Sequence, residues 1–169
     1  MGLGSELTQL GVTTIALNSA RHGGGVFVYG NAKLNGGRII SNSANGEGGG
    51  VYVYRQAELS GTCILNNSAT NGGGIAVEPG PNNYLTATNG CVVNNTDTAV
   101  VGTLSATKMW WGAKDGPSGA GPGKGDSVGP NVAYAPFITE TPSNCPERQG
   151  ESPPNQAKPI YLPLVIKGS

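Results

Sequence analysis

The side chains that could catalyse a reaction are few and scattered along this 169-residue chain. Four acids lie in its central region, Glu47, Glu58, Glu78 and Asp97. Hydrolases that work with two carboxylates hold them about 5 to 9 Å apart. Only Glu47 and Glu58 are close in sequence, and no regular spacing relates the others. We therefore expect no catalytic residues and predict that the chain is not an enzyme.

Side chains that could bind a metal are equally sparse. His22 is the only histidine, and it stands next to Gly23 in a segment with no second histidine and no cysteine. A zinc site needs three or four such ligands. The sequence therefore predicts neither a metal site nor a cofactor, and His22 is interpreted as an ordinary turn residue.

The elements that would position any site are repeats. Asn-Ser-Ala occurs three times at steps of 24 and 25 residues, and each copy is followed by three consecutive glycines. The asparagines are Asn18, Asn42 and Asn67, and the glycine runs begin at Gly23, Gly48 and Gly72. Two independent markers with one period indicate a short solenoid.

Each repeat is predicted to carry three short strands. Aliphatic residues alternate after each glycine run, at Val26 and Val28, Val51 and Val53, and Ile75 and Val77. A second column, three residues before each asparagine, consists of Ile15, Ile39, Ile64 and Val92. A third column follows the first within each repeat and consists of Leu34, Leu59 and Leu85. Glycines inside helices would cost about 1 kcal/mol each. A coil of strands stacked at about 4.8 Å, with these columns inside, is therefore favoured.

The asparagine column has a structural role in this interpretation. Asn18, Asn42 and Asn67 recur once per repeat, and a degenerate fourth copy adds Asn95. Asparagine tolerates left-handed turn geometry, and its amide can bond to the amide on the next rung. The four residues are predicted to form a structural ladder.

Two of the three cysteines occupy equivalent repeat positions. Cys63 and Cys91 each stand four residues before a ladder asparagine and next to an inward aliphatic residue, so they should point outward on adjacent rungs. The rung spacing lies within disulfide reach. A Cys63–Cys91 disulfide and a pair of stacked free thiols both remain open, with Cys145 left over as a free or intermolecular cysteine.

Four aromatic residues follow the first two glycine runs. Phe27 and Tyr52 should point outward on consecutive rungs, with Tyr29 and Tyr54 two residues further on. They are predicted to form an exposed strip. Such a strip can contact sugar rings or another protein, or can stabilise the sheet without any ligand.

These repeats resemble those of right-handed parallel β-helix proteins of the pectin-lyase-like superfamily. The resemblance covers residues 10–107 and is greatest to the bacterial surface branch, related to polymorphic outer-membrane proteins. The segments Trp110-Trp111-Gly112 and 131–137 are similar to the module that often closes such helices. Lyases of the superfamily bind calcium through clustered aspartates, whereas the acids here are dispersed. Residues 160–165 are similar to the C-terminal tail of many secreted proteins from Chloroflexi-type filamentous bacteria.

The chain divides into four predicted parts. Repeats with an N-terminal lead-in take residues 1–107, a closing module 108–138, a Pro-rich linker 139–159 and an apolar tail strand 160–169. The apolar residues of that tail are Ile160, Tyr161, Leu162, Leu164, Val165 and Ile166. The tail could fold back onto the side of its own β-helix, which is favoured, join an edge of another subunit, or serve for sorting or anchoring.

Composition limits the partners. Charged residues make up 12% of the chain with a formal net charge of zero, so nucleic-acid binding is not expected. No stretch approaches the ~20 apolar residues of a membrane-spanning helix. Residues 2–17 lack the basic and apolar regions of a signal peptide, which leaves open whether Met1 is the native start. Abundant Gly, Asn, Ser and Thr favour an extracellular or cell-surface location.

Together these features predict an all-β fold, a short right-handed parallel β-helix of about four rungs with a C-terminal cap and a tail strand. The expected function is that of a non-catalytic structural or adhesive module of a bacterial surface or secreted protein. One alternative is a filament subunit that assembles end to end or by donation of its tail strand. Another is a glycan-binding or vestigial polysaccharide-degrading β-helix.

Overall fold

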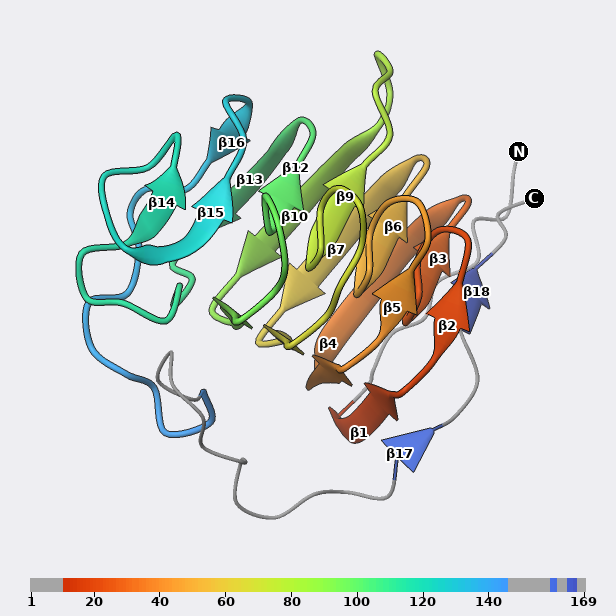
Figure 1. The fold of residues 1–169 in the computed structure, drawn as a ribbon, viewed down its shortest axis with the longest axis horizontal. Coiled ribbons are helices and arrows are strands. Elements are labelled where there is room, and N and C mark those ends of the chain that lie inside the picture. The colour runs from red at the N-terminus through yellow and green to blue at the C-terminus, as the bar shows by residue number, and fades with distance from the viewer. Residues whose placement is uncertain (1–10, 146–158, 161–163, 167–169) are drawn as a thin grey trace.

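Short parallel strands wind into a β-solenoid of about five turns (Figure 1). The computed structural model describes residues 11–145, 159–160 and 164–166. Every strand pair in that part of the chain is parallel, and its ordered elements are all strands. None of the described residues belongs to a helix that could cross a membrane. The predicted fold class is confirmed.

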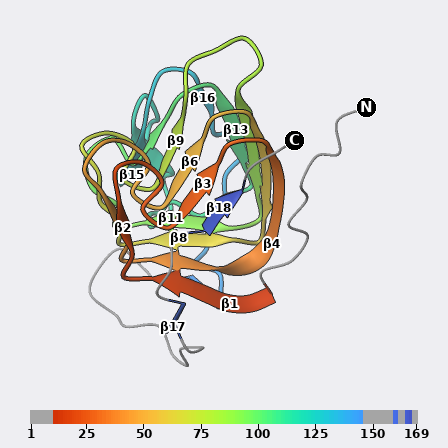
Figure 2. The ribbon, with the colours of Figure 1, turned by 90° about the vertical axis from the view of Figure 1, so that its right-hand side faces the viewer.

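Three faces run along the coil, and Figure 2 views them from its N-terminal end. The first is the sheet of β14 (Pro117–Gly119), β15 (Gly125–Val128), β12 (Val100–Val101), β9 (Ile75–Val77), β6 (Val51–Val53), β3 (Val26–Val28) and β18 (Leu164–Ile166). The second comprises the first half of β4 (Asn31–Ile40), β7 (Gln56–Ser60), β10 (Tyr84–Thr88), β13 (Leu104–Thr107) and β16 (Val132–Ala133).

The third face shares β4 with the second, because this long strand bends from one to the other. It comprises β17 (Pro159–Ile160), β1 (Gly11–Ala16), the second half of β4, β8 (Cys63–Leu65) and β11 (Cys91–Val93). A small sheet of β2 (Ser19–Ala20) and β5 (Ser43–Ala44) follows the asparagine corner. Each of the first four turns therefore contributes a strand, or half of the long strand β4, to every main face, and the fifth turn continues the third face only through an isolated bridge between Cys91 and Trp110.

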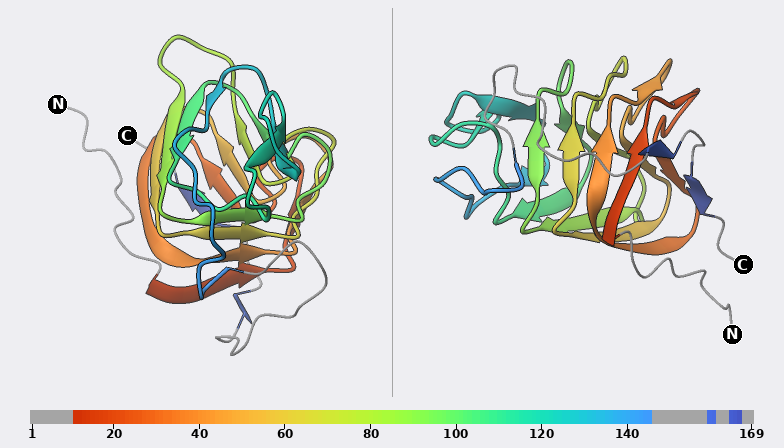
Figure 3. Two further views of the ribbon diagram at one scale, coloured as in Figure 1. Left: turned by 90° about the vertical axis from the view of Figure 1, so that its left-hand side faces the viewer. Right: turned by 90° about the horizontal axis from the view of Figure 1, so that it is seen from below.

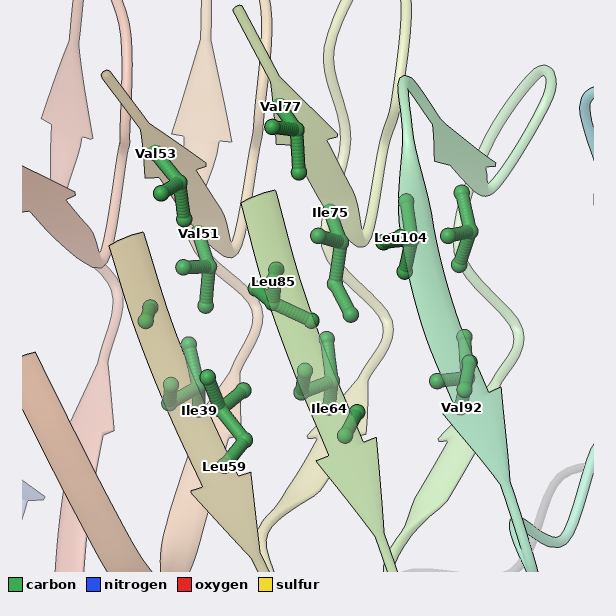
Figure 4. Close-up of a cluster of buried hydrophobic side chains, with 14 of the residues drawn as sticks. Ile39, Val51, Val53, Leu59, Ile64, Ile75, Val77, Leu85, Val92 and Leu104 are labelled. Atoms are coloured by element: carbon green, nitrogen blue, oxygen red, sulfur yellow. The ribbon is translucent and has the colours of Figure 1, made fainter. Parts of the chain in front are cut away.

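The aliphatic columns fill the inside of the tube (Figure 4). Ile15, Ile39, Ile64 and Val92 stack in register on the third face, each at most 2% exposed. The columns that start at Val26 and Val28 are equally buried on the first face. Apolar burial along the axis is the main stabilising contribution to such a tube.

One predicted column is wrong by two residues. Leu85 pairs with Ala57, and it is Ala87 that pairs with Leu59. The third repeat carries an extra loop before β10, so sequence distance alone misaligns its strand. The order of leucine and alanine is therefore reversed between these two turns, from Ala57 and Leu59 in β7 to Leu85 and Ala87 in β10. Each turn thereby keeps one large and one small side chain on this face, which preserves close packing.

The closing segment continues the coil for a fifth turn, where four were predicted. β15 pairs with β12 through Val128 and Val100, and β16 pairs with β13 through Val132 and Leu104. This turn has neither the Asn-Ser-Ala marker nor a glycine run, so repeat counting missed it. Met109 and Trp111 close the interior, whereas Trp110 lies outside the tube. The last turn faces the reader in the left view of Figure 3.

The four repeat asparagines form a continuous hydrogen-bonded column inside one corner. Asn18 donates its backbone N–H and its Nδ2 to Oδ1 of Asn42, each at 3.0 Å. Asn42 makes the same two bonds to Asn67, and Asn67 to Asn95, at 2.9 to 3.1 Å. A second Nδ2 bond holds a carbonyl of the preceding rung, as from Asn67 to Ile39 at 2.9 Å. The column thus satisfies buried polar groups between successive rungs.

Asp126 ends this column, at the place where a fifth asparagine would stand. Its carboxylate is buried and accepts bonds from the backbone N–H of Asn94 and from both the N–H and Nδ2 of Asn95, at 2.8 to 2.9 Å. Left-handed backbone geometry falls on the residue before each ladder position, such as Asn66 with φ 53°, and not on the ladder asparagine. The chain turns at that residue, while the ladder asparagine points inward.

The tail folds back, at the N-terminal edge of the solenoid (Figure 2). β17 pairs with β1 through Ile160 and Ile15, and β18 pairs with β3 through Val165 and Phe27. Their backbones therefore begin an additional rung on the first turn. Tyr161 and Leu162, like residues 1–10 of the lead-in and 146–158 of the linker, lie outside the described residues.

Candidate contact surface

Four aromatic side chains make two stacked pairs across β3 and β6. Phe27 and Tyr52 stack with ring centroids 5.3 Å apart, and Tyr29 and Tyr54 stack at 5.0 Å with an interplanar angle of 6°. Phe27 also stacks on Tyr29, at 6.4 Å. Because the strands pair in register, equivalent residues of successive turns are held one above the other. We call these four residues the aromatic strip.

Only part of the strip is accessible, which corrects the prediction that all of it is exposed. Tyr29 and Tyr54 are 49% and 39% exposed, but Tyr52 is only 5% exposed. The ring of His22 covers Tyr52 at 5.1 Å, and the Tyr52 hydroxyl bonds to the Glu78 carboxylate. Tyr52 is therefore a structural member of the strip, Phe27 is half-buried, and Tyr29 and Tyr54 offer the most exposed rings.

A pocket of about 300 Å³ adjoins the exposed end of the strip. Its wall is the loop between β9 and β10, the longest departure from the repeat. The lining residues are Tyr54, Arg55, Glu78, Pro79, Gly80, Pro81, Asn82 and Asn83. Tyr29 stacks on one face of the Tyr54 ring, and Tyr54 itself lines the pocket.

The pocket combines an aromatic ring with several kinds of polar group. Arg55 offers guanidinium donors, Glu78 a carboxylate, and Asn82 and Asn83 amides that both donate and accept. A sugar ring has an apolar face of C–H groups and a rim of hydroxyls that donate and accept hydrogen bonds. An aromatic ring beside mixed donors and acceptors complements both features.

Glu47 and Glu58, the two acids that are close in sequence, have different partners. Glu58 pairs with Lys33 at 3.7 Å on the exposed second face, and Glu47 accepts a bond from Asn71 at 2.9 Å. His22 accepts a bond from the Glu47 backbone N–H at 3.2 Å through Nδ1, so that nitrogen is already occupied. Within the described ranges, the only His, Cys, Asp and Glu side chains gathered closely enough to share an ion are three cysteines.

Neither arrangement left open for Cys63 and Cys91, a disulfide between them or a pair of free thiols, is correct, and Cys145 is not left over. Cys63 and Cys91 are in-register neighbours on β8 and β11, but Cys91 is bonded to Cys145, and Cys63 is a buried free thiol. In-register residues of parallel strands have Cβ atoms about 4.8 Å apart, beyond the 3.5 to 4.5 Å typical of a disulfide. Cys145 returns along the outside of the tube and approaches Cys91 to a Cα–Cα distance of 6.1 Å.

Sequence reasoning missed two features of this surface. The pocket depends on how the 78–83 loop is placed beside Tyr54, and the loop's two prolines and glycine signal only that it leaves the tube. The bonding of Cys145 depends on where a segment without periodicity returns. Ile138 anchors that segment through its N–H to the Met109 carbonyl at 3.0 Å, a contact with no local pattern.

Comparison with known proteins gave no family: no family model, no curated protein and no solved structure matches the chain.

Proposed function

We propose that the chain is a non-catalytic extracellular β-solenoid module that adheres to carbohydrate through the aromatic strip and its adjoining pocket. The observation that carries this proposal is the position of the half-exposed Tyr54 ring, stacked on Tyr29 and lining a pocket with Arg55, Glu78 and two amides. The surface or secreted location rests on composition and on the resemblance of the repeats to bacterial surface β-helices.

The scaffold supports display of a fixed surface. Each strand of the strip is in register with its neighbour, and the asparagine ladder binds successive turns to one another. Tyr29 and Tyr54 therefore lose little freedom when a ligand binds, and such preorganisation favours affinity. The dispersed acids support a binding role in place of catalysis.

Replacing Tyr54 with alanine should weaken carbohydrate binding at least about tenfold, the effect of losing roughly 1.4 kcal/mol from an aromatic contact. The ring is partly exposed, so the fold should remain intact, which circular dichroism would verify. Binding should be measured by affinity electrophoresis and calorimetry on a panel of neutral glucans, xylans and uronic-acid polysaccharides.

The matched control is Tyr84→Ala. Tyr84 is similarly exposed, at 41%, and starts β10, the strand that follows the 78–83 loop, but does not line the pocket. Its removal should leave binding unchanged. Equal losses for Tyr54→Ala and Tyr84→Ala, or no binding of the unaltered chain to any member of the panel, would count against adhesion through this pocket.

A filament subunit is the second candidate, and the placement of the tail favours it. β17 and β18 are added to β1 and β3 as extra parallel strands, so this edge accepts strands through its backbone. A tail donated by a second copy would make the same backbone bonds, as in other cases of strand addition.

Electron microscopy over a range of concentrations should distinguish the two candidates, using the full chain and a chain that ends at Pro159. The adhesive module predicts separate particles in both samples, because the tail pairs within its own chain. Fibres formed by the full chain and absent after truncation would instead establish strand donation.

A further inference from the structure

Three cysteine sulfurs meet on the outside of the third face, in a place that the proposed function does not use. Cys63, Cys91 and Cys145 are all at least nine-tenths buried, and their sulfur atoms lie within 4.8 Å of one another. Apolar side chains surround them: Ile40, Leu65, Val93, Trp110 and Ile138. Cys63 lies on β8, Cys91 on β11, and Cys145 on the segment that returns along the outside of the tube.

We propose that the reduced form of this protein binds one thiophilic divalent ion, of which Zn²⁺ is the prototype, through Cys63, Cys91 and Cys145. Zinc at about 2.3 Å from each sulfur in a tetrahedral site separates ligand sulfurs by about 3.8 Å. The sulfurs of Cys63 and Cys145 are 3.8 Å apart already. To complete a three-sulfur site, the bonded Cys91–Cys145 pair must move apart, and the sulfur of Cys91, which lies within 4.8 Å of that of Cys63, must take the same spacing from it.

Asn144 supplies oxygen atoms for the fourth position. Its backbone carbonyl oxygen lies 3.6 Å from Sγ of Cys63, and its side-chain Oδ1 lies 3.7 Å from Sγ of Cys145. One oxygen with three thiolates would complete the four-coordinate arrangement that zinc prefers. The neighbouring residues thus provide a full ligand set without a change of fold.

Arg38 offsets the charge of such a site. Three thiolates and one divalent ion carry a net charge of −1, which is unfavourable in an apolar environment. The Arg38 guanidinium donates to the Asn144 carbonyl at 3.2 Å, and its buried Nε has no hydrogen-bond partner among the described residues. Arg38 is also the in-register neighbour of Cys63, across β4 and β8.

The two forms are linked by ordinary thiol chemistry. A thiol reductant transfers two electrons and two protons to the Cys91–Cys145 bond, giving two cysteine thiols and an oxidised reductant. Binding then replaces the protons of three thiols with one divalent ion and releases three protons. In an oxidising compartment the disulfide excludes the ion, because Cys63 alone remains as a thiol ligand. The site is thus specific to the reduced chain.

Anaerobic titration of the full reduced chain with Cd²⁺ tests the proposal, because thiolate-to-cadmium charge transfer absorbs in the ultraviolet. We expect one ion per chain, release of roughly three protons per ion, and competition by Zn²⁺. The oxidised protein is the matched control, since it has the same sequence and one thiol, and it should show no charge-transfer band.

Cys63→Ser keeps the residues of the disulfide and removes one ligand, so its reduced form should bind Cd²⁺ at least about tenfold more weakly. If reduction loosens the fold, Zn²⁺ should restore the native circular dichroism of the unaltered chain and fail to do so for this variant. Absence of the band in the reduced chain, equal affinity of Cys63→Ser, or failure of Zn²⁺ to restore a loosened fold would each overturn the proposal. Polysaccharide binding is measured on the oxidised chain, so the two proposals fail independently.

Discussion

Replacing Asn67 with alanine should lower the free energy of unfolding by about 3 kcal/mol or more. The side chain is fully buried in the middle of the ladder. It accepts bonds from the N–H and Nδ2 of Asn42 and donates to the Ile39 carbonyl. Each buried polar group left without its partner costs about 1 to 3 kcal/mol. Chemical denaturation followed by circular dichroism would measure the loss.

The matched control is Asn71→Ala, four residues later in the same turn. Asn71 is exposed, and its amide donates to Glu47 at 2.9 Å on the surface. Its removal should change stability by less than about 0.5 kcal/mol. Similar losses for the two alanine variants would contradict a ladder that stabilises the coil.

The variant Asn67→Asp tests whether stability depends on the hydrogen bonds of this side chain or only on its volume. The aspartate has nearly the same shape and can still accept from Asn42, but it has no amide hydrogens to donate to Ile39 and Asn95. It also places carboxylate oxygens beside two oxygen acceptors in a buried corner. We expect this variant to be at least as destabilised as Asn67→Ala; stability close to that of the unaltered chain would show that only the volume matters.

The sequence predicts the regular part of the fold well because that part is periodic. In-register stacking requires equivalent residues at a fixed step, so the spacing of Ile15, Ile39 and Ile64 is enough to assign them to one column. The asparagine corner follows for the same reason. The aliphatic column and the asparagine corner both depend on contacts between neighbouring turns. Because the same contact recurs at every turn, the same residue type recurs in every copy of the repeat.

Prediction failed where the repeat is interrupted. The 78–83 loop led to a wrong column position for Leu85. The fifth turn stacks on Val100 and Leu104 of the fourth turn, but it lacks the Asn-Ser-Ala and glycine markers of the repeat. The position of Cys145 depends on a long return path, and the burial of Tyr52 on side chains from a different corner and a different turn. Such contacts occur once, so they leave no pattern to recognise. The pocket and the sulfur cluster both belong to this class.

Replacing Gly49 with alanine should destabilise the protein by about 3 kcal/mol or more, and it tests why the repeats need consecutive glycines. The first glycine of each run has left-handed geometry, as at Gly48 with φ 65°. The second has another constraint: a Cβ at Gly49 would lie 2.5 Å from the Gly73 carbonyl oxygen and would also overlap the Ser68 carbonyl. Real Cβ atoms essentially never approach so closely.

The obstructing atoms cannot easily move away. The Ser68 carbonyl already accepts a bond from Ala44 at 2.8 Å, and the Gly73 carbonyl accepts one from Gly50 at 3.0 Å. Both belong to the ladders that join one turn to the next, so relief of the overlap would separate two turns. Overpacking usually costs about 1 to 3 kcal/mol, and a rigid backbone neighbour places this site at the upper end or beyond.

Gly129→Ala is the control for the general effect of adding a methyl group. Gly129 lies outside the left-handed region, and a Cβ there would be 3.6 Å or more from its nearest neighbours, Val100 and Val101. The substitution should be neutral or stabilise by up to about 1 kcal/mol, because alanine restricts the unfolded chain. Thermal and urea denaturation of both variants would measure the difference. If Gly49→Ala were as stable as Gly129→Ala, then close approach of the turns could not be the reason for the glycine runs, and turn geometry at the first glycine would have to account for them alone.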